Sequence, residues 1–456
     1  MPKIYTKSIY IFTRDLRLFD NTCLIKSLEE SDTVLPIFIF NPVQIDDKNK
    51  FKSNESVQFL CESITDLDNQ LNKKGARLYC FYDDIDIIID KLLKHNYDAI
   101  YITKDYTPYS QKRYKLLENL CKKHKIDLIE EQDHMLHPVG IVFNGSGEPY
   151  SKFTPYMREA STYQINEPIK NSHKNYEKTK YSFEFTKNMN MFYEPNDNVI
   201  VRGGRANALK ILKNIKDYKN YNKERDNLYQ ETTHLSAYLK FNCVSIREVY
   251  YYFLDNLGIH NKLITQLYWR DFYIQIAHYH PHVFGNNMKE NYDIKWINDK
   301  SSLKKWQNGM TGIPIIDACM RELNNTGYMH NRGRLIVSNF LIKVLHIDWQ
   351  EGEKYFAKHL TDYDPCVNNG NWQWSASTGT DSQPYFRYFN PYLQSKKFDP
   401  ECVYIKKWVP ELVNIDNKDI HKWNEKYMNY DIDYPDPIVL DINSEIKKTM
   451  KMYKLN

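Results

Sequence analysis

A segment near the C-terminal end of the chain combines acids, amides and tryptophans at a density that an ordinary core does not require. It contains the acids Asp362 and Asp364, the amide Asn368, and the tryptophans Trp372 and Trp374. Acids can neutralise a buried cation, and an amide can both donate and accept hydrogen bonds to a polar ring. Helical residues two apart point in different directions, so the two tryptophans would have different roles.

A second polar group precedes this segment in the chain. Asn331, Arg334 and Ser338 are spaced i, i+3 and i+7, so they share one face of an expected helix. A buried arginine needs a carboxylate partner, and Asp362 or Asp364 can provide it. The pattern alone favours a structural salt bridge.

The expected helix over residues 262–280 carries a polar and aromatic stripe. Gln266, Trp269, Arg270 and Tyr273 share one face of it, as the wall of a binding pocket would require. The pattern by itself also allows Trp269 in the core and Arg270 as a surface charge. The residues expected to face the interior are Leu263, Leu267, Ile274 and Ala277.

A hydroxyl-rich segment indicates a phosphate site. Its residues are Thr232, Thr233, His234, Leu235 and Ser236. Hydroxyls and backbone N–H groups where a loop enters a helix suit a pyrophosphate, although Ser and Thr also cap helices that bind nothing. The chain has no Gly-x-Gly-x-x-Gly motif, so a Rossmann-type dinucleotide site is not expected.

The elements that must position these residues fall into two classes. Short apolar runs alternate with amphipathic stretches in the N-terminal part, which predicts an α/β domain with a doubly wound parallel sheet. The expected strands are 8–13, 34–40, 77–82, 99–103 and 126–130, and the expected helices include 55–71 and 109–124. The C-terminal part is predicted to be all-helical, with helices at 244–257, 262–280, 312–324 and 331–345.

Length and composition set further bounds. A chain of 456 residues is long enough for two domains. We expect an α/β domain at 1–135, a linker at 136–200, rich in Lys, Asn and Glu from about residue 163, and a helical catalytic domain at 201–456. The net charge of +4 means that a nucleic-acid partner would need a local basic surface.

Cysteine usage and hydropathy bound the class of protein. The eight cysteines are scattered, which excludes the spacing of a zinc or iron–sulfur site and indicates reduced thiols. No apolar run has the length of a membrane-spanning helix, and no secretory signal begins the chain. We expect a soluble intracellular protein, in the cytoplasm or the nucleus, without a metal or a membrane.

Taken together, the motifs resemble the photolyase/cryptochrome family, and most closely the class I cyclobutane pyrimidine dimer (CPD) DNA photolyases. The resemblance rests on TRDLRLFDN at residues 13–21, GEPYSKFTP at 147–155, NNGNWQWSASTGTD at 368–381 and YPDPIV at 434–439. It implies an α/β antenna-type domain, a helical domain that binds FAD, and UV-damaged DNA as the partner of a monomer. A second antenna chromophore is possible in this family, and its identity stays open.

The resemblance also implies roles for residues at the flavin. Arg334 with Asp362, together with Asp364, would contact the isoalloxazine ring, and Asn368 would lie near flavin N5. Tyr221 and the segment Thr232–Ser236 would hold the phosphates. An electron-transfer chain would run from the surface through Trp296 and Trp349 to Trp372 beside the flavin.

At the substrate, the resemblance implies a flipped-out dimer that receives an electron from photoexcited reduced FAD. The dimer would be contacted by Gln266, Trp269, Asn331 and Trp374, and the DNA by Arg270, Arg332, Leu335 and Arg387. Gln266 departs from the glutamate usual in class I enzymes, and glutamine is usual in (6-4) photolyases. Those enzymes use a histidine where this chain has Asn331, so CPD repair is favoured. A blue-light photoreceptor without repair is the other alternative.

Overall fold

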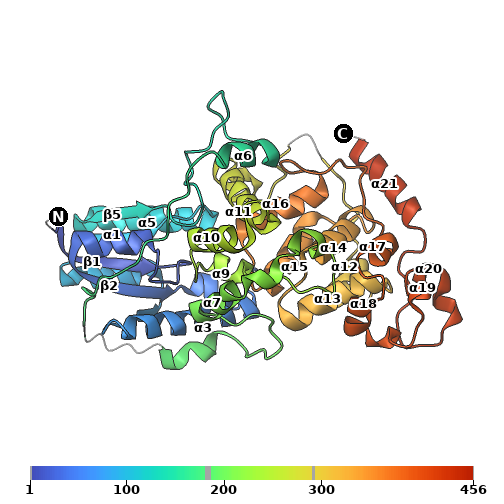
Figure 1. Cartoon of the computed structure of the whole chain (residues 1–456), viewed down its shortest axis with the longest axis horizontal. Coiled ribbons are helices and arrows are strands. Elements are labelled where there is room, and N and C mark those ends of the chain that lie inside the picture. The colour runs from blue at the N-terminus through green and yellow to red at the C-terminus, as the bar shows by residue number, and fades with distance from the viewer. Residues whose placement is uncertain (1–2, 180–185, 290–292, 455–456) are drawn as a thin grey trace. The chain divides into compact units, whose positions relative to one another are not determined.

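A computed structural model describes residues 3–179, 186–289 and 293–454 of the chain. The described residues form two compact units (Figure 1). The unit that contains the sheet, here the sheet unit, comprises Met1–Asn196, Val201–Lys219 and Thr233–Pro281. The other, here the helical unit, comprises Asp197–Ile200, Asn220–Thr232 and His282–Asn456.

The sheet unit is built on five parallel strands in the order β3-β2-β1-β4-β5. In the register, Ile9 lies between Leu35 of β2 and Ile100 of β4. Each of these side chains is fully buried, as expected for strands that are covered on both faces. The strands are β1 (Tyr5–Phe12), β2 (Ser31–Phe40), β3 (Tyr79–Tyr82), β4 (Ala99–Thr103) and β5 (Asp127–Glu131).

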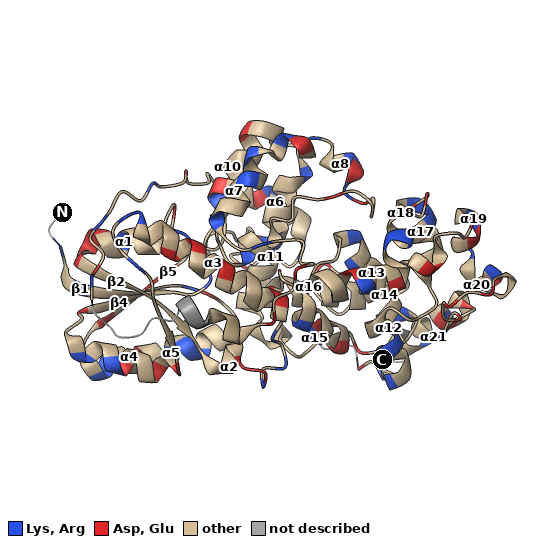
Figure 2. Cartoon of the chain, turned by 90° about the horizontal axis from the view of Figure 1, so that it is seen from below, with Lys and Arg blue, Asp and Glu red and all other residues tan. Residues whose placement is uncertain are grey.

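Helices cover both faces of this sheet (Figure 2). Helices α1 and α3 lie on one face, and α4 and α5 lie on the other. The first turns of α1 and α3 are fixed by side-chain caps, since Asn21 accepts from the Leu24 N–H and Ser53 from the Ser56 N–H. The helices are α1 (Thr22–Glu30), α2 (Pro42–Ile45), α3 (Asn54–Asn72), α4 (Ile85–Leu92) and α5 (Pro108–His124).

Further helices complete the sheet unit. They are α6 (Phe153–Ala160), α7 (Arg205–Lys213), α9 (Ser236–Lys240), α10 (Ile246–Leu257) and α11 (Lys262–Tyr279). Helix α11 packs against α6 and α10. Its expected interior residues Leu263, Leu267, Ile274 and Ala277 are all buried, which confirms the expected orientation.

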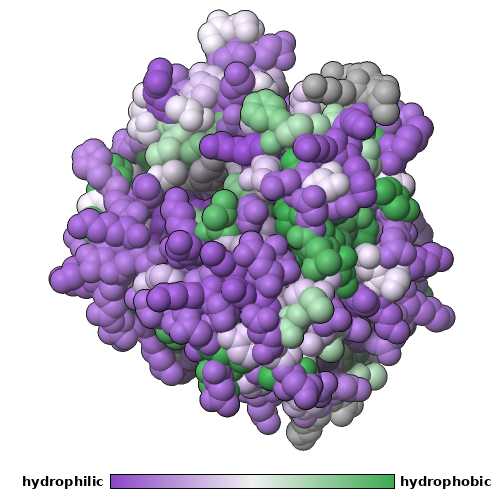
Figure 3. Space-filling view, turned by 90° about the vertical axis from the view of Figure 1, so that its right-hand side faces the viewer, coloured by the Kyte–Doolittle hydropathy of each residue, from purple (hydrophilic) through white to green (hydrophobic). Residues whose placement is uncertain are grey.

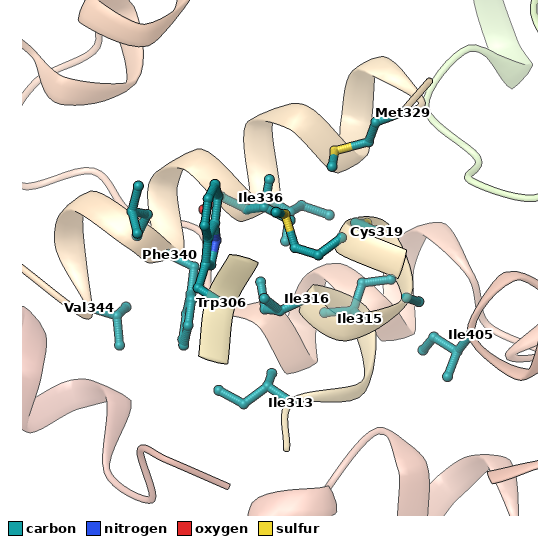
Figure 4. Close-up of a cluster of buried hydrophobic side chains, with 14 of the residues drawn as sticks. Trp306, Ile313, Ile315, Ile316, Cys319, Met329, Ile336, Phe340, Val344 and Ile405 are labelled. Atoms are coloured by element: carbon teal, nitrogen blue, oxygen red, sulfur yellow. The ribbon is translucent and has the colours of Figure 1, made fainter. Parts of the chain in front are cut away.

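The helical unit surrounds a core centred on Trp306, which lies among Ile316 and Phe340 (Figure 4). The Trp306 indole N–H donates to the Val337 carbonyl at 3.1 Å, so its single polar group is satisfied inside the core. The helices are α8 (Tyr221–Glu224), α12 (Lys300–Asn308), α13 (Pro314–Thr326), α14 (Asn331–Lys343), α15 (Trp349–His359), α16 (Pro365–Ala376), α17 (Pro391–Phe398), α18 (Val403–Trp408), α19 (Asn417–Ile420), α20 (Trp423–Lys426) and α21 (Ile442–Lys454).

The predicted fold class is confirmed, and the predicted strands and helices lie within a few residues of the observed ones. The two compact units do not follow the boundaries expected at residues 135 and 200, because 201–219 and 233–281 lie in the sheet unit. Those boundaries stay a prediction. Of the expected linker, residues 180–185 lie outside the described residues.

The surface is mixed in charge and mostly hydrophilic. Lys and Arg alternate with Asp and Glu on the helices seen in Figure 2. The face shown in Figure 3 is largely hydrophilic, with smaller hydrophobic patches between. All eight cysteines are buried and free of disulfide bonds. Among the described residues, no helix is both long and apolar enough to cross a bilayer.

Candidate functional site

Helices α14 and α16 bring two of the predicted motifs together in the helical unit. The hydroxyls of Ser338 on α14 and Ser375 on α16 lie 2.9 Å apart, and both side chains are buried. Ser375 stands between Trp372 and Trp374 in the chain. The face of α14 that carries Arg334 and Ser338 is therefore held against the tryptophan segment.

The start of α16 is fixed by Asp364. Its carboxylate accepts from the Cys366 N–H at 3.0 Å and the Val367 N–H at 3.2 Å, and Pro365 occupies the first helical position. A capping carboxylate at a helix N-terminus is stabilised by two backbone donors and by the helix dipole. Asp364 thus orients the helix that carries Asn368, Trp372 and Trp374.

Arg334 and Asp362 form a largely buried ion pair, as the sequence indicated. The guanidinium lies 2.9 Å from the Asp362 carboxylate and also donates to the Met329 carbonyl at 2.9 Å. Burial lowers the pKa of Arg334, but Asp362 and Tyr328 more than offset this effect, so the pKa is raised. The guanidinium of Arg334 therefore carries its charge, and Asp362 rather than Asp364 is its partner.

Tyr328 connects this pair to the predicted phosphate segment. Its ring lies beneath the Arg334 guanidinium, 5.5 Å from ring centroid to cation, and its hydroxyl lies 3.1 Å from that of Thr232. Burial raises the pKa of Tyr328, so the phenol stays protonated. Tyr328 was not among the residues predicted from the sequence, although its position just before the Asn331–Lys343 helix was a usable signal.

A second polar network holds Tyr221 and Arg332. The Arg225 guanidinium lies over the Tyr221 ring at 5.6 Å. Asp226 lies 2.7 Å from Arg332, whose guanidinium also lies over the Phe398 ring at 4.3 Å. Arg332, predicted to contact DNA, is thus engaged inside the helical unit, and its side chain is only 15% exposed.

The rest of the predicted phosphate segment belongs to the sheet unit. Thr233 and Leu235 are buried, whereas Ser236 is exposed and begins the five-residue helix α9. His234 adopts a left-handed backbone with φ of 50°. The Thr233 hydroxyl accepts from the Leu235 N–H at 3.5 Å. These features form a tight turn immediately before α9.

Trp372 is almost fully buried in the core of the helical unit. Its ring lies edge-on to Phe356, with centroids 4.9 Å apart and planes at 74°, and it also contacts Trp306 at 6.4 Å. Trp374 is half-buried, so the two tryptophans do face different surroundings, as their spacing predicted.

The other two tryptophans of the predicted chain lie in the same unit. Trp349 is 1% exposed, and its indole N–H donates to the Asn287 side chain at 2.9 Å. Trp296 is half-buried and packs edge-on against Tyr453 at 6.2 Å. Exposure therefore increases from Trp349 to Trp296, in the order that a chain leading to the surface requires.

The residues of the predicted polar and aromatic stripe on α11 differ in burial. Gln266 and Trp269 are half-buried, while Tyr273 is buried. Trp269 stacks on Phe153 of α6, with centroids 3.6 Å apart and planes at 8°, and more loosely on Tyr273 at 5.6 Å. Phe153 was not selected from the sequence, although it lies in the GEPYSKFTP motif.

Arg270 points into the sheet unit. Its guanidinium donates to the carbonyls of His134 and Leu239 and lies 3.5 Å from Asp271, which leaves its side chain 10% exposed. Burial raises the pKa of Asp271 to about 7, although Arg270 and the Leu136 N–H lower it. The DNA contact predicted for Arg270 stays a prediction, and these contacts give it a structural role.

The remaining predicted residues lie at or near the surface of the helical unit. Asn331 and Arg387 are exposed, and Leu335 is half-buried. Asn368 is half-buried, and its amide N–H donates to the Glu353 carbonyl at 3.5 Å. Asn331 and Leu335 are one helical turn apart on α14, so they share a face.

Comparison with known proteins shows that the chain is similar to DNA photolyases over nearly its whole length. Residues 263–455 match the model of the FAD binding domain of DNA photolyase, and residues 8–173 match that of DNA photolyase. The chain is 35% identical to the deoxyribodipyrimidine photo-lyase of Buchnera aphidicola subsp. Baizongia pistaciae, over 97% of both chains. It is 32% identical to that of Escherichia coli, over 95% of this chain and 96% of the relative.

Solved structures agree as well. An archaeal photolyase from Sulfolobus tokodaii with two FAD molecules superimposes with a TM-score of 0.90 and 38% identity, over 99% of this chain and 100% of that one. A class III photolyase from Agrobacterium tumefaciens also gives a TM-score of 0.90, at 30% identity, over 100% of this chain and 98% of that one. The chain therefore belongs to the photolyase/cryptochrome family.

Proposed function

We propose that this protein is a deoxyribodipyrimidine photo-lyase that uses bound FAD and light to repair cyclobutane pyrimidine dimers in DNA. The observation that carries the proposal is the linked set Thr232, Tyr328, Arg334 and Asp362, which lies in a chain similar from end to end to deoxyribodipyrimidine photo-lyases.

The donors and acceptors of the helical unit fit a flavin. The largely buried Arg334–Asp362 pair offers a fixed cation and a fixed acceptor, and Asn368 offers an amide that can donate or accept. Tyr221 and the turn from Thr232 to Ser236 would hold the phosphates. Reduced FAD, when bound, supplies the absorption of blue light and the electron that the dimer needs.

The tryptophans on α15 and α16 would keep that cofactor reduced. Trp372 and Trp349 are buried, and Trp296 reaches the surface, so an electron can enter at Trp296 and move inward. Each of these rings is held in place by its own neighbours, Trp372 by Phe356, Trp349 by Asn287 and Trp296 by Tyr453.

The substrate must leave the duplex to reach such a site. Photolyases are among the enzymes that extrude their target nucleotide, and a damaged base costs less to extrude because its stacking is already weakened. Trp269 and Trp374, both half-buried, would stack on the extruded dimer, with a gain of about 1–3 kcal/mol per base. Gln266 and Asn331 would hydrogen-bond it through their amides.

Cations and an apolar side chain would hold the flanking DNA. Arg387 is exposed and can contact phosphate directly, and the half-buried Leu335 would add an apolar contact. Arg332 and Arg270 are held by Asp226 and Asp271, so their part in DNA binding would be to position other groups. The similar Sulfolobus tokodaii photolyase holds two FAD molecules, and we include a second chromophore of open identity in the proposal.

The decisive experiment measures the light-dependent loss of two lesions from irradiated duplex DNA. Purified reduced protein is assayed separately for cyclobutane dimers and for (6-4) products, with a dark reaction as control. Loss of dimers alone is expected. Loss of (6-4) products instead would move the protein to the other repair class, as Gln266 would suggest. Bound flavin without any repair would identify a photoreceptor.

A further inference from the structure

Lys343, the last residue of α14, has a fully buried side chain. Its ammonium donates to the Ser377 hydroxyl at 3.1 Å, the Tyr385 carbonyl at 3.1 Å and the Arg387 carbonyl at 2.9 Å. An ammonium has three donors, and all three are used. All of these acceptors lie in or at the start of one segment, residues 377–390 between α16 and α17, here the 377–390 loop.

This lysine is an unusual choice for a core position. A buried charge is normally paired with an opposite charge. Among the described residues, the salt bridges do not include Lys343, and burial lowers its pKa to about 7. The groups that the ammonium contacts are a hydroxyl and two carbonyls, all of them neutral. A methionine of similar length would suit this site if only packing mattered.

The 377–390 loop carries the surface that Lys343 holds in place. Arg387 and Phe386 are exposed, the latter by 56%, and they lie in a turn closed by the bond from the Arg387 N–H to the Pro384 carbonyl at 3.0 Å. A second anchor comes from the same helix, since Asn339 accepts from the Phe389 N–H at 2.8 Å. Helix α14 thus fixes this turn at two points.

We propose that Lys343 is a positioning residue for DNA binding, which fixes the backbone on both sides of Phe386 so that the Arg387 side chain is presented to a phosphate of the damaged strand. This inference rests on the proposed function. One ammonium binds the carbonyls of Tyr385 and Arg387, which are two residues apart, so the backbone at Phe386 cannot rotate freely. A loop ordered in advance loses less entropy on binding, which raises affinity.

The test compares Lys343→Met with Thr449→Val in the full-length, flavin-loaded protein. The Thr449 hydroxyl donates to the Lys343 carbonyl at 2.6 Å, so Thr449→Val disturbs the same site and leaves the ammonium contacts in place. Three quantities are measured: flavin per chain, the dissociation constant for dimer-containing DNA in the dark, and the repair yield per photon at saturating DNA.

For Lys343→Met we expect the dissociation constant to rise about tenfold or more, with flavin content and saturating repair yield near those of the parent. Thr449→Val should leave all three near the parent values. A coupling measurement sharpens the test. Arg387→Gln should weaken binding strongly in the parent and much less in the Lys343→Met background, because a released loop no longer presents that side chain.

Two results would overturn the inference. Unchanged DNA affinity in Lys343→Met, or an Arg387→Gln effect that is the same in both backgrounds, would overturn the inference. If Lys343→Met does not fold, Asn339→Ala releases the other anchor and should raise the dissociation constant in the same way, and an unchanged value would overturn the inference. If the parent protein fails to remove dimers in light, the proposed function is refuted instead. The two failures can be told apart, because DNA binding is measured in the dark and does not require repair.

Discussion

Gly352 on α15 lies against the indole of Trp372 on α16, so closely that a β-carbon on Gly352 would be 2.1 Å from Cη2 of Trp372. No side chain larger than hydrogen fits there without movement, because the Leu341 side chain closes the space on another side, at 2.7 Å from the same position. The place of the predicted flavin-proximal tryptophan is therefore decided by a glycine on the neighbouring helix.

Replacing this glycine tests how strictly Trp372 must be placed. Gly352→Ala should lower the free energy of unfolding by about 1–3 kcal/mol, the usual cost of overpacking a core. It should also slow photoreduction of oxidised FAD, because the indole must shift. Thermal unfolding and the decay of the flavin absorption band in blue light measure both effects. Gly145→Ala is the matched control, since a β-carbon there meets nothing within 4 Å.

The electron path is tested by Trp372→Phe. Phenylalanine keeps an aromatic ring in the packing against Phe356 but is much harder to oxidise, so photoreduction of oxidised FAD should be lost. Repair by chemically reduced enzyme should remain largely intact. Trp423→Phe, at another buried tryptophan of the helical unit, should leave photoreduction unchanged. Photoreduction that persists in Trp372→Phe would show that another route feeds the flavin.

Gln266 stands where class I enzymes usually carry glutamate, and this difference predicts that restoring the glutamate raises repair activity. Gln266→Glu restores the acid that class I enzymes usually carry and should raise the repair yield per photon without changing flavin content. The side chain is half-buried and its amide makes only a long bond, 3.4 Å, to the Lys262 carbonyl, so the fold should tolerate the change. Gln266→Leu should lower the yield. Equal yields in all three proteins would show that this position does not limit repair.

The ion pair of Arg334 and Asp362 predicts linked losses of stability and cofactor. Asp362→Asn leaves a largely buried guanidinium without its counter-charge, and breaking a buried pair costs about 3–5 kcal/mol. Arg334 keeps 26% exposure, so we expect the lower end of that range, with less FAD retained per chain. Glu411→Gln is the control, because it removes the partner of Arg321 in a pair whose carboxylate is more exposed than that of Asp362. If Asp362→Asn retains its full flavin content, the Arg334–Asp362 pair is not part of the flavin-binding site.

Asp271 predicts a pH dependence of stability in the sheet unit. Its pKa is raised from 3.8 to about 7, so between these values the unfolded chain is ionised while the folded one holds the proton. The contribution of the protonated Asp271 carboxyl to the free energy of unfolding is therefore fully present below about pH 4 and is lost as the pH rises to about 7. Asp271→Asn removes this loss, so its unfolding temperature relative to the parent should increase over that range.

Asp90→Asn supplies the comparison for this measurement. The pKa of Asp90 is lowered to about 2 by Lys123 and His124, so its stabilising contribution is present above its unfolded pKa and is lost only in stronger acid. The difference between Asp90→Asn and the parent should therefore stay nearly constant between about pH 4 and about pH 7. A constant difference for Asp271→Asn as well would contradict the assigned burial of that carboxyl.

The sequence by itself determined the elements and the chemistry they carry. Alternating apolar runs predicted the parallel sheet, because strands buried on both faces must be apolar throughout. Helical spacing placed Arg334 and Ser338 on one face and separated Trp372 from Trp374, since both follow from the period of the helix. The requirement that a buried arginine have a carboxylate partner reduced the choice to Asp362 or Asp364.

Only the tertiary structure decided which of these groups meet. It paired Arg334 with Asp362 and used Asp364 as a helix cap, and it connected Thr232 to the pair through Tyr328. It turned Arg270 and Arg332 toward carboxylates and placed the buried Lys343 beneath the 377–390 loop. Such contacts join residues far apart in the chain, and they depend on how side chains fill a close-packed interior, which local periodicity does not specify.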